Sequence, residues 1–147
     1  MTEEGARVLA MKDRKPKVAE EVAQAEFERF CETMDLDIDQ AHMDAEDKAS
    51  LEDARRRIVR AMMRGKLVVN NDGEPVLSPS DGGESITFRQ LKGAHYMAID
   101  KKKVGHNVER THAMLAEQTR QSPQRFANMD GPDYKVCTAI ITLFVAG

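Results

Sequence analysis

The spacing of the apolar residues changes twice along this chain of 147 residues. Up to Gly65 they recur every three or four positions, which is typical of amphipathic helices. Between residues 66 and 89 they follow a strand-like pattern around the turn signal Asn71-Asp72-Gly73. Beyond residue 90 the helical spacing returns. The sequence therefore predicts an α+β fold that is mostly helical, with two N-terminal helices, a small antiparallel sheet of two or three strands and a C-terminal helical region.

The two N-terminal helices are predicted from their apolar faces. The first spans residues 17–34, and its expected apolar face is Val18, Val22, Phe27, Phe30, Cys31 and Met34. The second begins with Asp44 or Asp47 as its cap and runs to Arg64, where Gly65 ends it. Its expected stripe is Leu51, Ala54, Ile58, Ala61 and Met62.

The sheet is predicted from short β-branched runs beside turn residues. The strands 67–69 and 74–77 flank the turn signal, and a third strand over 85–89 would complete a meander. Because Pro75 has no backbone N–H to donate, we expect the second strand to lie at an edge of the sheet.

Three helices are predicted after the sheet. The first spans residues 91–99, and Gly105 interrupts the chain after it. The second is marked by Val108, His112, Leu115 and Thr119 and closes before Pro123. Phe126 and Met129 fall in a turn-like segment. The last helix starts near Pro132 and carries a broad apolar face made of Tyr134, Cys137, Ile140, Ile141 and Phe144.

Length and composition favour one globular domain. The chain is 41% hydrophobic and 32% charged, and its length suits a single core. We expect residues 17–147 to form that domain, with a helical pair at 17–65, a sheet at 66–89 and helices at 90–147. Residues 1–16 show no sustained period and are predicted to be a mobile arm. With no signal segment and no apolar run of membrane-spanning length, we expect a cytoplasmic protein without a membrane partner.

Charge is strongly segregated along the chain. Residues 17–54 hold 3 basic against 13 acidic side chains, and residues 55–66 hold six basic side chains and no acidic one. We expect the basic run to form a solvated face that pairs with the acidic first helix. The consecutive residues Arg55, Arg56 and Arg57 spread around their helix and no aromatic is interleaved, which argues against nucleic acid. A DNA-binding regulatory protein using helix 55–66 stays an alternative.

An acidic connector joins the first two helices. Its residues Asp35, Asp37, Asp39 and Glu46 occupy positions one, three, five and twelve of a helix–loop–helix calcium site. Gln40 stands where that loop needs glycine, and His42 where it needs an apolar residue. A solvated linker with helix-capping aspartates explains the same residues. We therefore predict no metal, and keep a cation-binding module as a second alternative.

Motifs for catalysis are missing from the sequence. The histidines 42, 95, 106 and 112 have no ligand spacing, and Cys31 and Cys137 form no C-x-x-C pair. Both thiols are expected to be small core residues in a reducing compartment. No nucleophile elbow is present. The sequence predicts a protein that is not an enzyme and has no cofactor.

The C-terminal part carries three recognisable motifs. They are the strand Ile86-Thr87-Phe88-Arg89, the run from Leu91-Lys92-Gly93-Ala94 to Ile99-Asp100, and the segment Met129-Asp130-Gly131-Pro132-Asp133-Tyr134 before an apolar helix that ends near Phe144. Over residues 84–146 this arrangement resembles the tail assembly chaperones of long-tailed bacteriophages.

The resemblance implies a function in assembly. Such chaperones coat the hydrophobic helices of the tape measure protein while tail tube subunits assemble around it, and they are absent from the finished particle. The implied partners are the tape measure protein and tail tube subunits, with self-association, in the cytoplasm of a bacterial host carrying a phage or prophage. The candidate residues for core packing or partner contact are Tyr96, Met97, Leu115, Ile140, Ile141 and Phe144.

Overall fold

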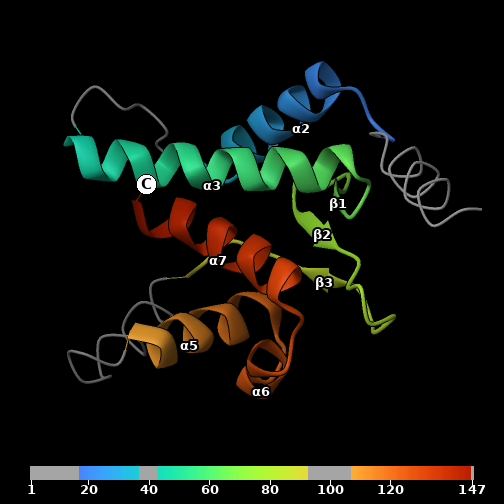
Figure 1. The fold of residues 1–147 in the computed structure, drawn as a ribbon, viewed down its shortest axis with the longest axis vertical. Coiled ribbons are helices and arrows are strands. Elements are labelled where there is room, and N and C mark those ends of the chain that lie inside the picture. Colours follow the sequence, from blue (N-terminus) through green and yellow to red (C-terminus); the bar gives the residue numbers. More distant parts are fainter. Residues whose placement is uncertain (1–16, 37–42, 93–106, 147) are drawn as a thin grey trace, which may run out of the picture.

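The computed structural model describes residues 17–36, 43–92 and 107–146 (Figure 1). The fold is α+β and mostly helical, as the sequence predicts. The arm predicted over 1–16 and the break at Gly105 lie outside the described residues. The elements are α2 (Glu20–Thr33), α3 (Ala45–Met63), β1 (Leu67–Val69), β2 (Pro75–Leu77), β3 (Ile86–Thr87), α5 (Asn107–Thr119), α6 (Pro123–Ala127) and α7 (Gly131–Ala146).

Helix α3 lies across the middle of the molecule (Figure 1). Its contacts with α7 are the most extensive between any two described elements, and α2 packs against it as well. The small sheet follows the C-terminal end of α3, and α5 packs on α7. The N-terminal helical pair and the C-terminal helices therefore meet along α3.

The ends of α3 are those expected from its sequence. The side chain of Asp44 accepts a hydrogen bond from the backbone N–H of Asp47 at 2.8 Å, so Asp44 is the cap. Gly65 takes a φ of +74° directly after the helix, a conformation that glycine adopts without strain. All five residues of the predicted apolar stripe of α3 are buried. The prediction for this helix is confirmed.

Helix α2 begins three residues later than predicted, so Val18 precedes it and is only partly buried, and the buried face of the helix itself differs from the prediction at Val22. Phe27, Phe30 and Cys31 are buried as expected, but Val22 is 54% exposed and Ala23 takes its place in the core. Adjacent residues of a helix point about 100° apart, so a stripe that includes Ala23 turns Val22 toward solvent. The assignment of Val22 to the apolar face is wrong.

The three strands form an antiparallel meander in the order β1-β2-β3. Leu77 pairs with Leu67 on one side and with Ile86 on the other. The prediction that Pro75 places its strand at an edge is therefore wrong, because β2 is central. Pro75 is the first residue of β2, where a missing N–H does least harm, and its carbonyl accepts from the N–H of Phe88 at 2.9 Å. Strand β3 is also shorter than the predicted span 85–89.

The C-terminal helices differ in part from the expected ones. Helix α5 agrees with the prediction, whereas the segment around Phe126, predicted to be turn-like, contains the short helix α6. Pro123 stands in the first turn of α6, where no backbone N–H is required. Leu91 is buried but not helical, so a helix does not begin there, and residues 93–99 lie outside the described ranges.

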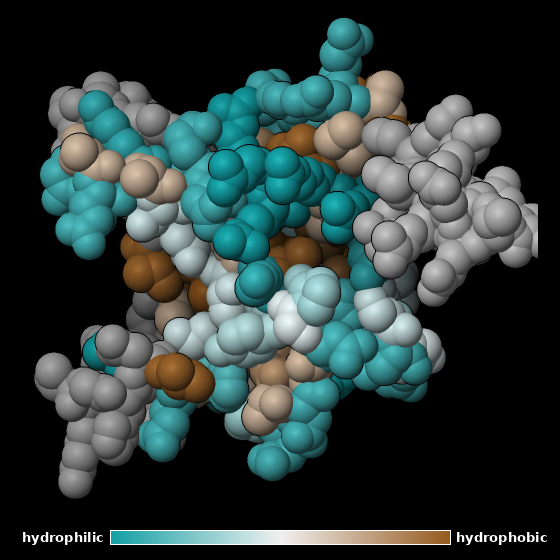
Figure 2. Space-filling view, viewed as in Figure 1, coloured by the Kyte–Doolittle hydropathy of each residue, from teal (hydrophilic) through white to brown (hydrophobic). Residues whose placement is uncertain are grey.

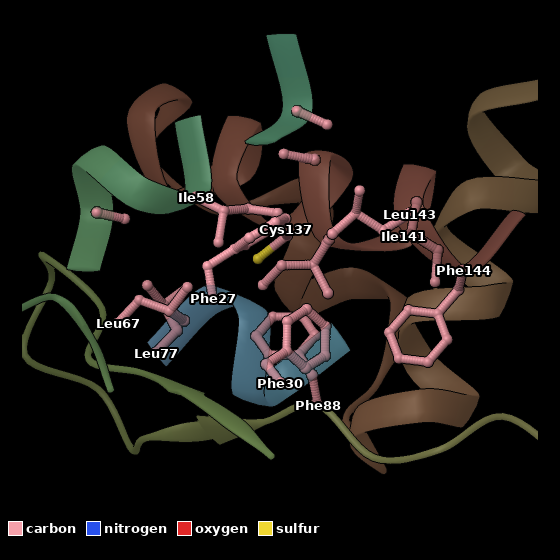
Figure 3. Packing of buried hydrophobic residues seen from close by; sticks show 14 of the residues in the cluster. Phe27, Phe30, Ile58, Leu67, Leu77, Phe88, Cys137, Ile141, Leu143 and Phe144 are labelled. Carbon is pink, nitrogen blue, oxygen red and sulfur yellow. The ribbon is translucent and has the colours of Figure 1, made fainter. Parts of the chain in front are cut away.

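One apolar core joins the helices to the sheet (Figure 3). The rings of Phe27 and Phe30 from α2 meet edge to face with centroids 6.4 Å apart, and Phe30 lies 6.0 Å from Phe144 of α7. Such aromatic pairs add to the free energy gained by burying their area. The aromatic contact ties the first described helix to the last.

The start of α7 is anchored by a buried carboxylate. Asp133 accepts hydrogen bonds from the backbone N–H of Ser80 at 2.8 Å, from its hydroxyl at 3.2 Å and from the ammonium group of Lys66 at 3.3 Å. The side chain of Asp133 is only 2% exposed. Because Lys66 precedes β1 and Ser80 follows β2, this carboxylate fixes α7 to both ends of the hairpin.

We expect Asp133→Ala to lower the free energy of unfolding by about 2–3 kcal/mol, because hydrogen bonds to a buried charge are lost together. Urea denaturation measures the loss. The exposed carboxylate of Asp130 stands directly before the same helix, in the cap position, and Asp130→Ala should cost no more than about 1 kcal/mol. Equal losses in both variants would contradict the anchoring role of Asp133.

Gly73 provides a second test of the fold. It has a φ of +78° in the hairpin turn, and a Cβ atom there would overlap the side chain of Thr33 at the end of α2. Gly82 has a similar φ of +79° but open space around it. We expect Gly73→Ala to lower the free energy of unfolding by about 2–4 kcal/mol, from backbone strain and overlap together, and Gly82→Ala by only about 1 kcal/mol from strain. Similar losses would show that the hairpin and α2 do not approach so closely.

Candidate functional site

The residues predicted for packing or partner contact are core residues wherever the structure describes them. Leu115 and Ile140 are 0% exposed, Ile141 is 5% exposed and Phe144 is 4% exposed. In this arrangement they stabilise the fold and leave no surface for a partner. Tyr96 and Met97 lie outside the described residues. A contact surface has to be sought among other side chains.

The predicted cation loop is described only at its two ends. Asp35 is exposed and has a φ of +52° just after α2, and Glu46 is exposed in the first turn of α3. Asp37 and Asp39 lie outside the described residues. Within residues 17–36, 43–92 and 107–146 no group of three or more His, Cys, Asp or Glu side chains is placed to hold a metal ion.

An open groove with a volume of about 840 Å³ runs between α2 and α3. Val59 and Met63 supply its apolar part, and the charged residues Glu20, Glu52, Asp53, Arg55, Arg56 and Arg60 line it as well. In Figure 2 hydrophobic atoms are visible between the hydrophilic side chains of these two helices. The groove combines an apolar strip with charges of both signs.

Arg55 is held in place between the two helices. Its guanidinium group donates to the amide oxygen of Gln24 at 2.7 Å and lies 5.6 Å from the centroid of the Phe27 ring. A cation over an aromatic face is attracted by the ring quadrupole. The basic run was expected to pair with the acids of the first helix, but Arg55 contacts α2 through an amide and a ring.

The next two arginines bind an acid of their own helix. Arg57 donates to Asp53 at 2.9 Å, and Arg56 pairs with the other carboxylate oxygen of Asp53. The hydrogen bond from Arg57 is the main cause that holds the pKa of Asp53 below its usual value. Among the described residues no ion pair joins α2 to residues 55–66, so the predicted pairing with acidic side chains of that helix is wrong.

A second depression, of about 200 Å³, lies where the C-terminal half of α3 meets the start of α7. Its lining includes the five cationic side chains of Arg57, Arg60, Arg64, Lys66 and Lys135, and Asp133 as the one carboxylate. We call it the basic pocket. Lys66 and Arg57 have acidic partners in Asp133 and Asp53. Within the described part of the chain no ion pair or side-chain hydrogen bond forms for Arg60, Arg64 or Lys135.

Part of this pocket could have been predicted from the spacing of residues in the sequence. Arg57, Arg60 and Arg64 are spaced i, i+3 and i+7, which places them on one face of a helix, although the adjacent arginines at 55–57 suggested an even spread. Lys135 follows the last of them, Arg64, by 71 positions in the sequence. Only the packing of α7 on α3 brings it beside them.

Two further groups have chemistry of their own. The imidazole Nε2 of His112 lies 3.1 Å from the Tyr134 hydroxyl, and the rings meet edge to face with centroids 5.5 Å apart.

Cys31 and Cys137 are buried free thiols, and burial raises the pKa of each to about 12. The expectation that both cysteines are small core residues is confirmed. A thiol that keeps its proton at neutral pH is a weak nucleophile.

Comparison of the chain with protein-family models, with curated proteins and with solved structures found no match. Over the residues that the structure describes, no helix has the length and apolar character needed to cross a membrane. The function therefore has to be argued from the side chains themselves.

The thiols give a direct test of the core. We expect neither Cys31 nor Cys137 to react with a thiol reagent at pH 8 in the native protein, and both to react at once in denaturant. An exposed control is Ser85→Cys, whose thiol should react within seconds. Burial holds the pKa of each thiol in the folded protein above its value in the unfolded chain. The contribution of the two protonated thiols to stability is therefore complete below about pH 9 and is lost as the pH rises toward 12. Rapid labelling of either native thiol would contradict the burial.

Proposed function

We propose that this protein is a tail assembly chaperone of a phage or prophage, without enzymatic activity, that binds the tape measure protein in the host cytoplasm and leaves before the particle is complete. The observation that carries the proposal is the arrangement of motifs between Ile86 and Phe144. In the structure these motifs contribute β3, the buried residue Leu91 and the whole of α7. The proposal is supported by the burial of Ile86, Phe88 and Leu91 in the same core as α7, while residues 93–100 of the second motif lie outside the described residues.

The groove between α2 and α3 is suited to binding a helix of a partner protein. An amphipathic helix binds by laying its apolar face into a groove while its charged flanks meet the rims. The half-buried side chain of Met63 would meet the apolar face, and Arg56, Arg60 and Glu20 would meet the flanks. Since Leu115 and the α7 residues are buried in the core, we assign partner contact to this groove instead.

Many copies on one partner would add to the strength of binding. A single groove of this size offers a modest apolar area, so one copy is expected to bind weakly. The resemblance implies a partner with long hydrophobic helices, along which successive copies would bind side by side. Self-association between neighbouring copies would raise the overall affinity without new contacts to the helix.

The test is co-expression with a tape measure protein from the same genome. We expect the two proteins to copurify, with several copies of this chain for each partner, and the partner to become more soluble. Purified particles from the same cells should lack the chaperone. An insoluble tape measure protein in the presence of the folded chain, with no copurification, would reject the proposal.

A variant pair tests the groove. Ala49 is exposed on the groove side of α3, so Ala49→Trp would fill the space without disturbing the core. We expect a loss of affinity of at least about tenfold, because the partner helix could no longer seat. Ala127→Trp places the same ring on exposed α6, and should bind as the wild type does. Normal binding by both variants would exclude the groove as the contact surface.

A further inference from the structure

We propose that the basic pocket between α3 and α7 binds a phosphate group of a small phosphorylated ligand. This inference does not depend on the assembly function. It rests on three observations about the pocket: unpaired cations that converge from two helices, the start of a long helix beside them, and a volume suited to a small anion.

The first observation is the charge. Arg60 and Arg64 project from one face of α3, and Lys135 faces them from α7. Like charges four residues apart on a helix, such as Arg60 and Arg64, repel one another and destabilise the helix unless an anion or solvent screens them. The planar guanidinium group offers two parallel N–H donors that match the oxygens of a phosphate. Three cationic side chains without acidic partners therefore line the basic pocket.

The carboxylate in the pocket does not cancel this charge. The oxygens of Asp133 accept from Ser80 and Lys66, so their hydrogen-bonding capacity is directed to the loop and to one of the five cations. Asp53, which neutralises part of Arg57, is not among the residues that line the pocket. Against this single carboxylate, Arg60, Arg64 and Lys135 remain available for a ligand.

The second observation is the start of α7. This helix has 16 residues, and Pro132, Asp133 and Val136 of its first turns line the pocket. The first turn of a helix carries the positive end of the dipole, which favours an anion beside it. The dipole of α7 therefore acts in the same direction as the three free cations.

The third observation is the size. A volume of 200 Å³ equals the share of liquid taken by about six or seven water molecules. Such a space admits one phosphate group with a short organic part. The lining also lacks an aromatic ring on which a base could stack. These properties favour a small phosphorylated ligand over DNA or RNA.

Calorimetry on the full chain with inorganic phosphate and pyrophosphate as probes tests the inference. We expect saturable binding of one anion per chain, tighter for pyrophosphate, and no comparable heat from sodium chloride at the same ionic strength. The variant Arg64→Gln/Lys135→Gln should weaken binding by at least about tenfold. Neither residue lines the groove used for the partner helix, so failure here leaves the assembly proposal untouched.

The matched control is Lys48→Gln/Arg120→Gln, which removes one lysine and one arginine from exposed positions outside both the pocket and the groove. Its affinity for pyrophosphate should stay within about twofold of the wild type. Thermal unfolding of both variants verifies that each is folded. The inference is overturned if neither anion binds, if both variants weaken binding equally, or if only oligonucleotides bind, with a steep dependence on salt.

Discussion

The contact between α3 and α7 holds the two halves of the molecule together. Small side chains lie at this contact, since Ala54 and Ala139 are both buried and line the same depression between the helices. Alanines allow two helix axes to approach closely, and Ile58 and Ile140, both 0% exposed, fill the core. The basic pocket also depends on this contact, because it exists only where the two helices meet.

Helix α3 supplies both candidate binding surfaces because its polar residues are divided between two faces. Toward α2 it presents Arg55 and Arg56, and toward α7 it presents Arg57 and Arg64. The same side-chain type serves different purposes at these positions. The guanidinium group of Arg55 contacts Gln24 and Phe27, whereas Arg64 has no acidic partner in the described structure. Whether an arginine is available for a ligand therefore depends on the side chains that contact it more than on its residue type.

Local rules predicted the helices and the hairpin well, since those depend on nearby residues. The cap at Asp44, the stop at Gly65 and the turn at Gly73 follow from spacing and backbone preference alone. Some errors were local, since Val22 was placed on the buried face of α2 and the segment that forms α6 was predicted to be turn-like. Others concern packing between distant segments. Pro75 was placed at an edge because sequence shows the missing donor but not that β3 would pair with the other side of its strand. Lys135 could not be assigned to a site before α7 was placed.

The two proposed sites share one lining residue, and the residues that they do not share allow each to be tested separately. Arg60 lines both the groove and the basic pocket, so its replacement would disturb the helical partner and the phosphate together. Arg64 lines only the pocket, and Ala49 lines only the groove. If the sites are energetically coupled, the coupling should pass through Arg60, because a guanidinium group bound to phosphate can no longer pair with an acid on the partner helix. Phosphate would then weaken partner binding in the wild type but not in Arg64→Gln/Lys135→Gln, which loses the phosphate and keeps Arg60. If the sites are independent, phosphate leaves partner binding unchanged in both proteins.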